Sequence, residues 1–191
     1  MPVGDCESAF AAAAAQDGVD LVRARVPWLN QRGHFGLPKH AQIARQALAS
    51  IFAALGGDPD TQEGKLLTPL PGDFFHEPSR TFIEIDEVQH FTTARLITLD
   101  LYPARWPLGF DLSMYREMIS LYSPRADRFR SSKTAVAFGV GGRQRQRAYY
   151  DALRDLATPA MGYPALIRVP APDGDGAAAY GRVRDQILKL R

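Results

Sequence analysis

The chain has 191 residues, of which 46% are hydrophobic and 23% charged, and its net charge is +2. This length predicts one domain with a sizeable core, or a core with one large insertion, and the composition excludes a collagen, a coiled coil or a wholly disordered chain. Cys6 is the one cysteine, so an internal disulfide is excluded and we expect reducing, cytoplasmic surroundings. We expect Cys6 to lie at a frayed terminus and not to act as a nucleophile.

Residues 11–15 are five alanines, but they do not indicate a secretory signal. Asp5 and Glu7 stand where such a signal carries positive charges, and Gln16 and Asp17 end the apolar stretch early. We expect a short surface helix here. No apolar run reaches the roughly 18 residues that a membrane span needs, so we predict a soluble protein with no membrane contact.

Apolar periodicity over residues 39–55 predicts the first large helix, with two glycines at its end. Residues 57–64 are rich in Gly, Asp and Pro and predict a loop. The extended segments 65–69 and 73–76 flank a Pro-Gly turn, so a hairpin between them is one expectation. Residues 80–86 are rich in β-formers and predict a strand that follows a turn at Pro78-Ser79.

The second half predicts an insertion and then a helix, a strand and a helix. Residues 93–101 fit either a helix or a strand. The other expected elements are a helix over 112–121 capped by Asp111, a buried strand over 135–140, a helix over 144–157, a strand over 165–169 and a helix over 178–190. This order predicts a mixed α/β fold in one domain over residues 1–191.

The predicted strand over 80–86 carries two acidic side chains on one face. Because side chains alternate along a strand, Glu84 and Asp86 share a face, and Ile83 and Ile85 share the other. Asp73 lies eleven residues before Glu84, and a return through the intervening turn could place its carboxylate beside theirs.

Such a group of carboxylates repels itself unless it is solvated, paired or bound to a cation. Oxygen ligands at this density suit Mg²⁺ or Mn²⁺, which could activate water at a phosphodiester. Gln89 and His90 follow directly, and either could position the attacking water. The alternative is that Glu84, Asp86 and Glu87 form the exposed side of an edge strand, and the spacing leaves both interpretations open.

Residues 82–91 resemble the core motif of the PD-(D/E)XK nuclease superfamily, whose members have a restriction endonuclease-like fold. The closest similarity is to the branch that includes very-short-patch repair endonucleases, in which a strand carries Glu-x-Asp-Gly-x-x-His. Asp73 and Phe74 resemble the upstream aspartate motif, and Glu87 stands where glycine is usual. The matching positions are Glu84, Asp86, Gln89 and His90.

A second, independent similarity to this branch lies downstream. The branch follows with a helix bearing Asp-x-x-Arg, a glycine with an aromatic residue, and an apolar strand ending in arginine. Here these are Asp151 with Arg154, Gly162 with Tyr163, and Arg168 after two apolar residues. The resemblance implies a restriction endonuclease-like mixed sheet flanked by helices, with Mg²⁺ held by Asp73, Glu84 and Asp86.

The chain departs from the family pattern in two ways. About fifty residues separate His90 from the second motif, which predicts a mostly helical insertion over about 92–134 between core segments at about 38–91 and 135–191. Asp86 stands where the family usually has a lysine. Lys65, Arg80 or Lys133 could replace that lysine, or activity could have been lost.

A basic block follows the acidic motif. Between residues 102 and 148 there are nine Arg or Lys and three Asp or Glu. This block is either a solvated face or a phosphate-binding surface. The glycines before residue 143 predict a turn, and the cations that follow them at the start of a helix favour an anionic ligand. The candidate nucleic-acid-binding residues are Arg125, Arg128, Arg130, Lys133, Arg143, Arg145, Arg147 and Arg154.

Three functions follow from these patterns. The first is a Mg²⁺-dependent endonuclease acting on DNA, with RNA left open as a substrate. The second is a catalytically silent nucleic-acid-binding or assembly module that kept the fold. The third is an interaction protein whose insertion mediates self-association, for example as a homodimer.

Overall fold

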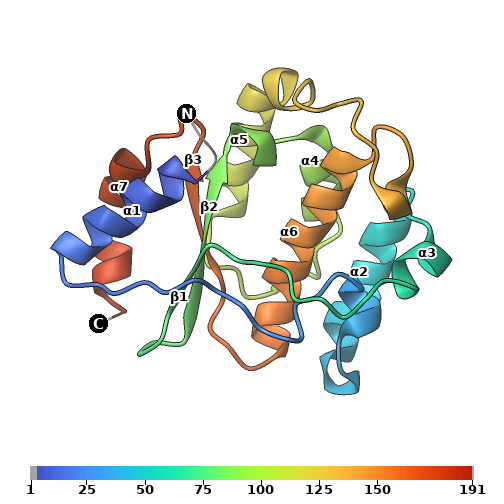
Figure 1. The fold of residues 1–191 in the computed structure, drawn as a ribbon, viewed down its shortest axis with the longest axis horizontal. Coiled ribbons are helices and arrows are strands. Elements are labelled where there is room, and N and C mark those ends of the chain that lie inside the picture. Colours follow the sequence, from blue (N-terminus) through green and yellow to red (C-terminus); the bar gives the residue numbers. More distant parts are fainter. Residues whose placement is uncertain (1–3, 191) are drawn as a thin grey trace.

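The computed structural model describes residues 4–190, in which a three-stranded sheet separates one pair of helices from the other helices (Figure 1). Strand β1 (Phe74–His76) pairs antiparallel with β2 (Thr81–Glu87), and β3 (Ile167–Ala171) pairs parallel with β2. The helices are α1 (Asp5–Gln16), α2 (Gln42–Ala54), α3 (Pro59–Glu63), α4 (Thr93–Asp100), α5 (Leu112–Ala126), α6 (Arg143–Ala160) and α7 (Gly176–Leu188). The expected mixed α/β class is confirmed. Within the described residues no helix is both long and apolar enough to cross a membrane.

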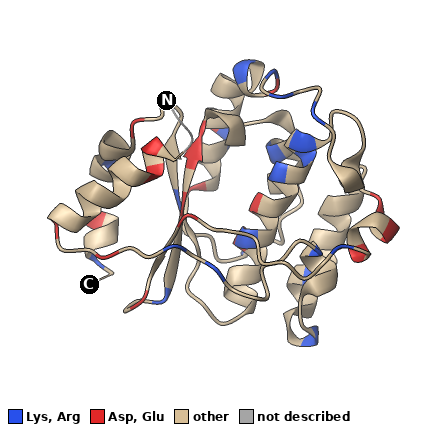
Figure 2. Ribbon diagram, in the orientation of Figure 1, with Lys and Arg blue, Asp and Glu red and all other residues tan. Residues whose placement is uncertain are grey.

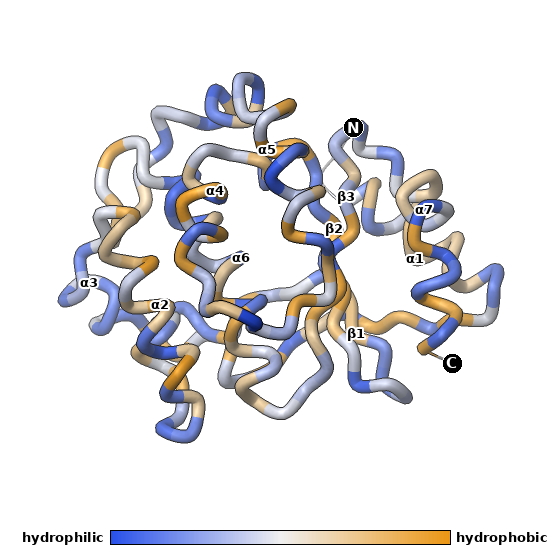
Figure 3. Tube along the Cα trace, turned by 180° about the vertical axis from the view of Figure 1, so that it is seen from behind, coloured by the Kyte–Doolittle hydropathy of each residue, from blue (hydrophilic) through white to orange (hydrophobic). Residues whose placement is uncertain are grey.

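One core lies between the sheet and the pair α1 and α7. Ile83 and Ile85 of β2 pack there with Phe10 of α1 and Tyr180 of α7. Figure 3 shows the strands as one of the more apolar parts of the chain. Because Ile83 and Ile85 use this face of β2, Glu84 lies on the opposite face, toward α6, as the alternation predicts.

A second core lies on the other side of the sheet, where α6 packs against both α2 and α4. Leu48 and Phe52 of α2 meet Leu153 and Leu156 of α6 there. Helices α4 and α5 come from the predicted insertion, and α4 contributes the fully buried Arg95 to the interior beside α6. This segment is therefore part of the main packing of the molecule.

Several predicted elements are confirmed with shifted bounds, and two are wrong. Residues 93–100 form a helix, which settles the open choice. The predicted loop over 57–64 contains α3, because the Asp58 carboxylate accepts hydrogen bonds from the first-turn amides. The predicted strand over 135–140 is a tight loop around a short 3-10 turn, η4 (Val136–Phe138), closed by the pairing of Ala135 with Gly139.

The expected hairpin between residues 65–69 and 73–76 does not form. Strand β1 pairs with β2 through the turn over 77–80, whereas Pro69 pairs with Asn30. The expectation of a frayed Cys6 is also wrong, since this side chain is 1% exposed and burial raises the pKa of its thiol to about 11. Such a thiol is inert at neutral pH.

Candidate active site

A cleft of about 440 Å³ lies between β2 and α6. Figure 2 shows acidic residues along α1 and β2 and basic residues along α6, on its two sides. The two walls therefore carry opposite charge. The acidic wall has Glu7, Asp73, Glu84 and Glu87, the basic wall has Lys65, Arg143, Arg147 and Arg154, and Gln89, His90 and Asp151 also line the cleft.

Asp73 and Glu84 are held together by the β1–β2 hairpin. The Asp73 backbone amide donates to Glu84 Oε1 at 3.2 Å, and the Ile85 amide donates to Asp73 Oδ2 at 2.8 Å. Burial raises the pKa of Glu84 to about 8, although Arg154 beside it acts in the opposite direction. Burial also raises the pKa of Asp73. Two neighbouring carboxyl groups thus reach the cleft with little water around them.

Asp86 does not join these two acids. Its carboxylate is 1% exposed and lies on Arg168, whose Nη1 donates to both oxygens at 2.7 and 2.9 Å. The Tyr115 hydroxyl donates to Asp86 as well, at 2.8 Å. Among residues 4–190 no three His, Cys, Asp or Glu side chains are grouped so as to hold a metal ion. The three-acid cluster expected from the sequence is reduced to Asp73 and Glu84, because Arg168 takes up the third charge.

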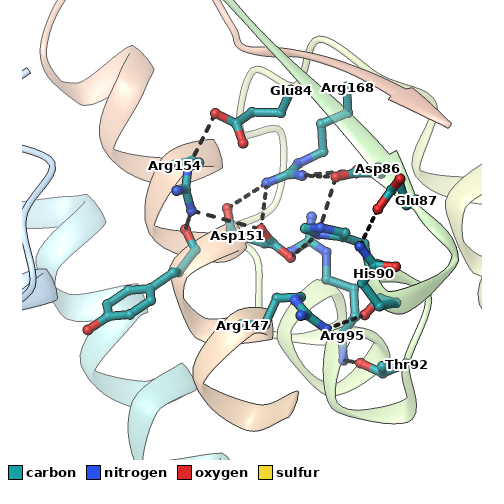
Figure 4. A network of polar contacts seen from close by, with 12 residues as sticks. Glu84, Asp86, Glu87, His90, Thr92, Arg95, Arg147, Asp151, Arg154 and Arg168 are labelled. Atoms are coloured by element: carbon teal, nitrogen blue, oxygen red, sulfur yellow. Dashed lines mark hydrogen bonds and ion pairs between the residues drawn. The ribbon is translucent and has the colours of Figure 1, made fainter. Parts of the chain in front are cut away.

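His90 is oriented by two acids behind the cleft (Figure 4). Its Nδ1 lies 2.9 Å from Asp151 Oδ2 and 3.4 Å from Asp86 Oδ1. Burial alone would lower the pKa of His90, but Asp151 and Asp86 raise it above its ordinary value. Burial opposes ionisation of Asp151, but His90 and Arg168 hold the pKa of Asp151 well below its usual range. The pair therefore favours an imidazolium beside a carboxylate.

Arg168 lies at the centre of a buried ionic network. Its Nε donates to Asp155 Oδ1 at 2.6 Å and its Nη2 to the Asp151 carbonyl at 3.0 Å. Arg95 and the Tyr102 hydroxyl both donate to the other Asp155 oxygen at 2.6 Å. Since buried charges are costly unless they are paired and hydrogen-bonded, this network fixes the positions of Asp86 and Asp151.

A scan against known families finds one matching family model over residues 50–190, described as a family of unknown function, DUF7255. The match covers more than half of the chain. The chain belongs to the DUF7255 family. No curated protein and no solved structure matches it. The ionic network and the two cleft acids of the hairpin all lie within the DUF7255 segment.

The candidate nucleic-acid-binding residues of this DUF7255 chain divide into three groups. Arg143, Arg147 and Arg154 line the cleft. Arg130 and Lys133 lie in a neighbouring depression that also includes Arg143. The other three line neither: Arg145 donates to the carbonyls of Leu55 and Phe138, and Arg125 and Arg128 are exposed.

The three candidates to replace the missing lysine are also separated. Lys65 lines the cleft, and burial lowers its pKa. Arg80 instead stacks on the Tyr163 ring, with its guanidinium carbon 4.6 Å from the ring centroid. Lys133 lies in the neighbouring depression. Lys65 is therefore the one of the three whose position fits a role in the cleft.

Sequence reasoning missed Glu7, which comes from α1 and lies outside the matched DUF7255 segment. Its Oε2 is buried without a hydrogen-bond partner among the described residues, and its charge raises the pKa of Asp73. It also missed Arg95, Tyr115 and Asp155. Arg95 offered no signal, because residues 93–101 fit either a helix or a strand and the exposed Ile97 and Leu101 lie away from the buried side of α4.

Proposed function

We propose that this DUF7255 chain is a Mg²⁺-dependent phosphodiesterase that cleaves DNA, built on a restriction endonuclease-like fold. The observation that carries this proposal is the pair of neighbouring carboxyl groups, Asp73 and Glu84, facing a wall of arginines across one cleft. Carboxylates and phosphate-binding cations at this proximity are the ingredients of metal-assisted phosphoryl transfer.

The residues present fit a magnesium ion. Mg²⁺ is commonly bound by one or two carboxylates together with waters and substrate phosphates, so a third protein carboxylate is not required. Asp73 and Glu84 would hold it: burial raises the pKa of both carboxyl groups, and a cation between them would favour their ionised forms. When bound, Mg²⁺ supplies charge stabilisation at the phosphate and lowers the pKa of water.

The protein's own side chains account for the other parts of the reaction. Arg154 and Arg147 bind the non-bridging phosphate oxygens from the α6 side. His90, kept protonated by Asp151 and Asp86, donates a proton to the leaving oxygen. This role differs from the positioning of water expected from the sequence. Gln89 donates to Glu87 Oε2 at 2.6 Å at the edge of the cleft, and this pair orients the attacking water.

The fold assignment is supported by the contacts between the two motif segments. Asp86 meets Arg168, and His90 meets Asp151, across 82 and 61 residues of sequence. Glu84 lies 3.3 Å from Arg154. Residues that match the family pattern in two separate stretches thus contact each other in one site.

The test is cleavage of plasmid DNA, linear duplex DNA and single-stranded DNA with Mg²⁺ or Mn²⁺, compared with the same reactions in EDTA. We expect Asp73→Asn and Glu84→Gln to abolish cleavage while keeping the shape of each side chain, and His90→Gln to lower the rate by about 10²–10⁴-fold. Glu77→Gln, an exposed acid in the β1–β2 turn, is the matched control and should leave the rate unchanged.

The alternative function has a distinct outcome. DNA binding without cleavage under both metals would favour a catalytically silent nucleic-acid-binding or assembly module. Absence of both cleavage and binding would contradict both functions.

A further inference from the structure

A second depression adjoins the cleft at the start of α6. It has a volume of about 360 Å³ and is lined by Arg130, Lys133, Val136, Arg143 and Gln146 among others. Val136, Arg143 and Gln146 line the cleft as well. The two hollows therefore form one continuous surface, and we call the second one the flanking subsite.

The flanking subsite carries positive charge without acidic partners. Its lining includes no Asp or Glu, and within residues 4–190 neither Arg130 nor Lys133 forms an ion pair with a carboxylate. The cations of this region also repel one another. Burial lowers the pKa of the nearby Arg147, and Asp151 opposes this effect. The positive charges of Arg143 and Arg130 lower the pKa of Arg147 further. An anion in the flanking subsite would offset this repulsion.

An exposed apolar side chain separates the two hollows. Val136 is 76% exposed, although its neighbours Ala137 and Phe138 are buried. The loop is held by the Asp58 amide, which donates to the Ala137 carbonyl at 2.8 Å, and by Arg145, which donates to the Phe138 carbonyl at 2.5 Å. A branched apolar side chain fixed between two basic hollows suits contact with a base.

Two chain segments lie against α6 at the end of the cleft away from the flanking subsite. Tyr150 of α6 donates to the Gln31 carbonyl at 3.0 Å, and Arg154 donates to the Pro71 carbonyl at 2.7 Å. The segment that leads into β1 thus crosses α6 there (Figure 1). At 1.5 Å per residue, Arg154 lies roughly 16 Å along α6 from Arg143. A strand bound in the cleft can therefore continue past Arg143 into the flanking subsite.

We propose that the flanking subsite binds the nucleotide next to the scissile phosphate of a single polynucleotide strand, with Val136 against its base. Each hollow has the volume of a pocket for one drug-sized molecule, which matches one nucleotide and not a base pair. This inference rests on the proposed function for the position of the scissile phosphate, and it names the substrate as a single strand that continues from the cleft past Arg143.

Binding of fluorescently labelled oligonucleotides, followed by anisotropy in EDTA, tests the subsite without cleavage. Single-stranded DNA should bind at least several-fold more tightly than the duplex of the same length. Arg130→Ala/Lys133→Ala should weaken single-strand binding on the order of tenfold, and should reduce the slope of log Kd against log salt by about 0.7 for each phosphate that the variant no longer neutralises. Arg25→Ala/Lys39→Ala removes the same charge from exposed positions outside both hollows and is the matched control.

Val136→Ser tests the contact with the base. It should weaken binding of the single strand about threefold and leave an abasic strand of equal length unaffected. Single-stranded RNA has the same phosphodiester backbone as single-stranded DNA. Measuring its binding in parallel shows which of the two nucleic acids the flanking subsite prefers.

The outcomes separate the two proposals. Duplex binding as tight as single-strand binding, or a salt slope that Arg130→Ala/Lys133→Ala leaves unchanged, would overturn the flanking subsite. Single-strand binding with the expected slope change, but without cleavage when Mg²⁺ is added, would keep the subsite and reject the phosphodiesterase.

Discussion

Two histidines lie against opposite sides of α6, and their surroundings drive their pKa values in opposite directions. His34 is 7% exposed, and its Nδ1 lies 2.7 Å from the Tyr149 hydroxyl beside the Phe52 ring. Burial, with a smaller effect of Arg45, lowers the pKa of His34 to about 4. The pKa of His90 is raised by Asp151 and Asp86 despite burial. The neutral form of the imidazole is therefore favoured in one region and the protonated form in the other.

The geometry of α6 explains why the two regions differ so sharply. Tyr149 and Asp151 are two residues apart, which corresponds to roughly 200° around a helix of 3.6 residues per turn. Tyr149 faces α2 with Leu153, while Asp151 and Asp155, four residues apart, face Arg168 of β3. A single helix buried on both sides thus separates an apolar core from an ionic one.

We expect the largest loss of stability when the central arginine of the ionic side, Arg168, is removed. Arg168→Met leaves Asp86 and Asp155 buried without their main partner, and we expect the free energy of unfolding to fall by about 3–5 kcal/mol. Urea unfolding followed by circular dichroism measures it.

Arg116→Met provides the comparison on the surface. Arg116 pairs with Asp100 while both are largely exposed, so this change should cost at most about 1 kcal/mol. An equally small loss for Arg168→Met would show that the ionic side contributes little to holding the fold together.

The apolar side of α6 could be predicted from the sequence much better than the ionic side. The periodicity of residues 144–157 places Tyr149, Leu153 and Leu156 together, and all three are buried. Periodicity reports which apolar side chains are buried. In β2 the alternation of Ile83 and Ile85 with Glu84 and Asp86 therefore also identified the face that carries the two acids. It carries no information about which buried charges pair, because pairing depends on segments that the fold brings together.

Asp86 and Arg168 show this difference. Arg168 enters the site because β3 runs parallel to β2 with Arg168 opposite Glu84, a register set by the whole chain. The resemblance to a nuclease motif grouped Asp86 with Asp73 and Glu84, whereas the geometry pairs Asp86 with Arg168. The prediction for Val136 was wrong because an apolar side chain was taken to be buried. Its apolar character predicted a buried strand, but a five-residue loop closed by the pairing of Ala135 with Gly139 exposes it.

A smaller effect is expected from the contact between His34 and Tyr149 on the apolar side. In Tyr149→Phe the His34 amide and ring lose a shared partner in a buried site, and we expect a loss of about 1–3 kcal/mol in the free energy of unfolding. Tyr150→Phe removes a hydroxyl that is partly accessible, so its cost should be smaller. Equal losses for the two variants would indicate that the His34–Tyr149 contact has no special weight.

The smallest effect is a difference in pH dependence, and it tests the comparison most directly. The unfolded chain binds a proton at a histidine with the ordinary pKa of 6.5, whereas folded His34 binds one only near pH 4. The stability associated with neutral His34 is therefore complete above pH 6.5 and is lost as the pH falls toward 4. Folded His90 holds its proton above pH 6.5, so its contribution is complete below pH 6.5 and is lost as the pH rises through its raised pKa.

Thermal unfolding midpoints of the wild type, His34→Gln and His90→Gln across this pH range separate the two contributions, because other groups cancel when each variant is subtracted from the wild type. The difference for His34→Gln should shrink toward low pH, and the difference for His90→Gln should shrink toward high pH. Asp151, whose pKa is lowered, adds its own loss only below its ordinary value of 3.8, outside this range. If both differences changed in the same direction with pH, α6 would not separate an apolar from an ionic environment, and the protonated His90 required for proton donation in the cleft would lose its physical basis.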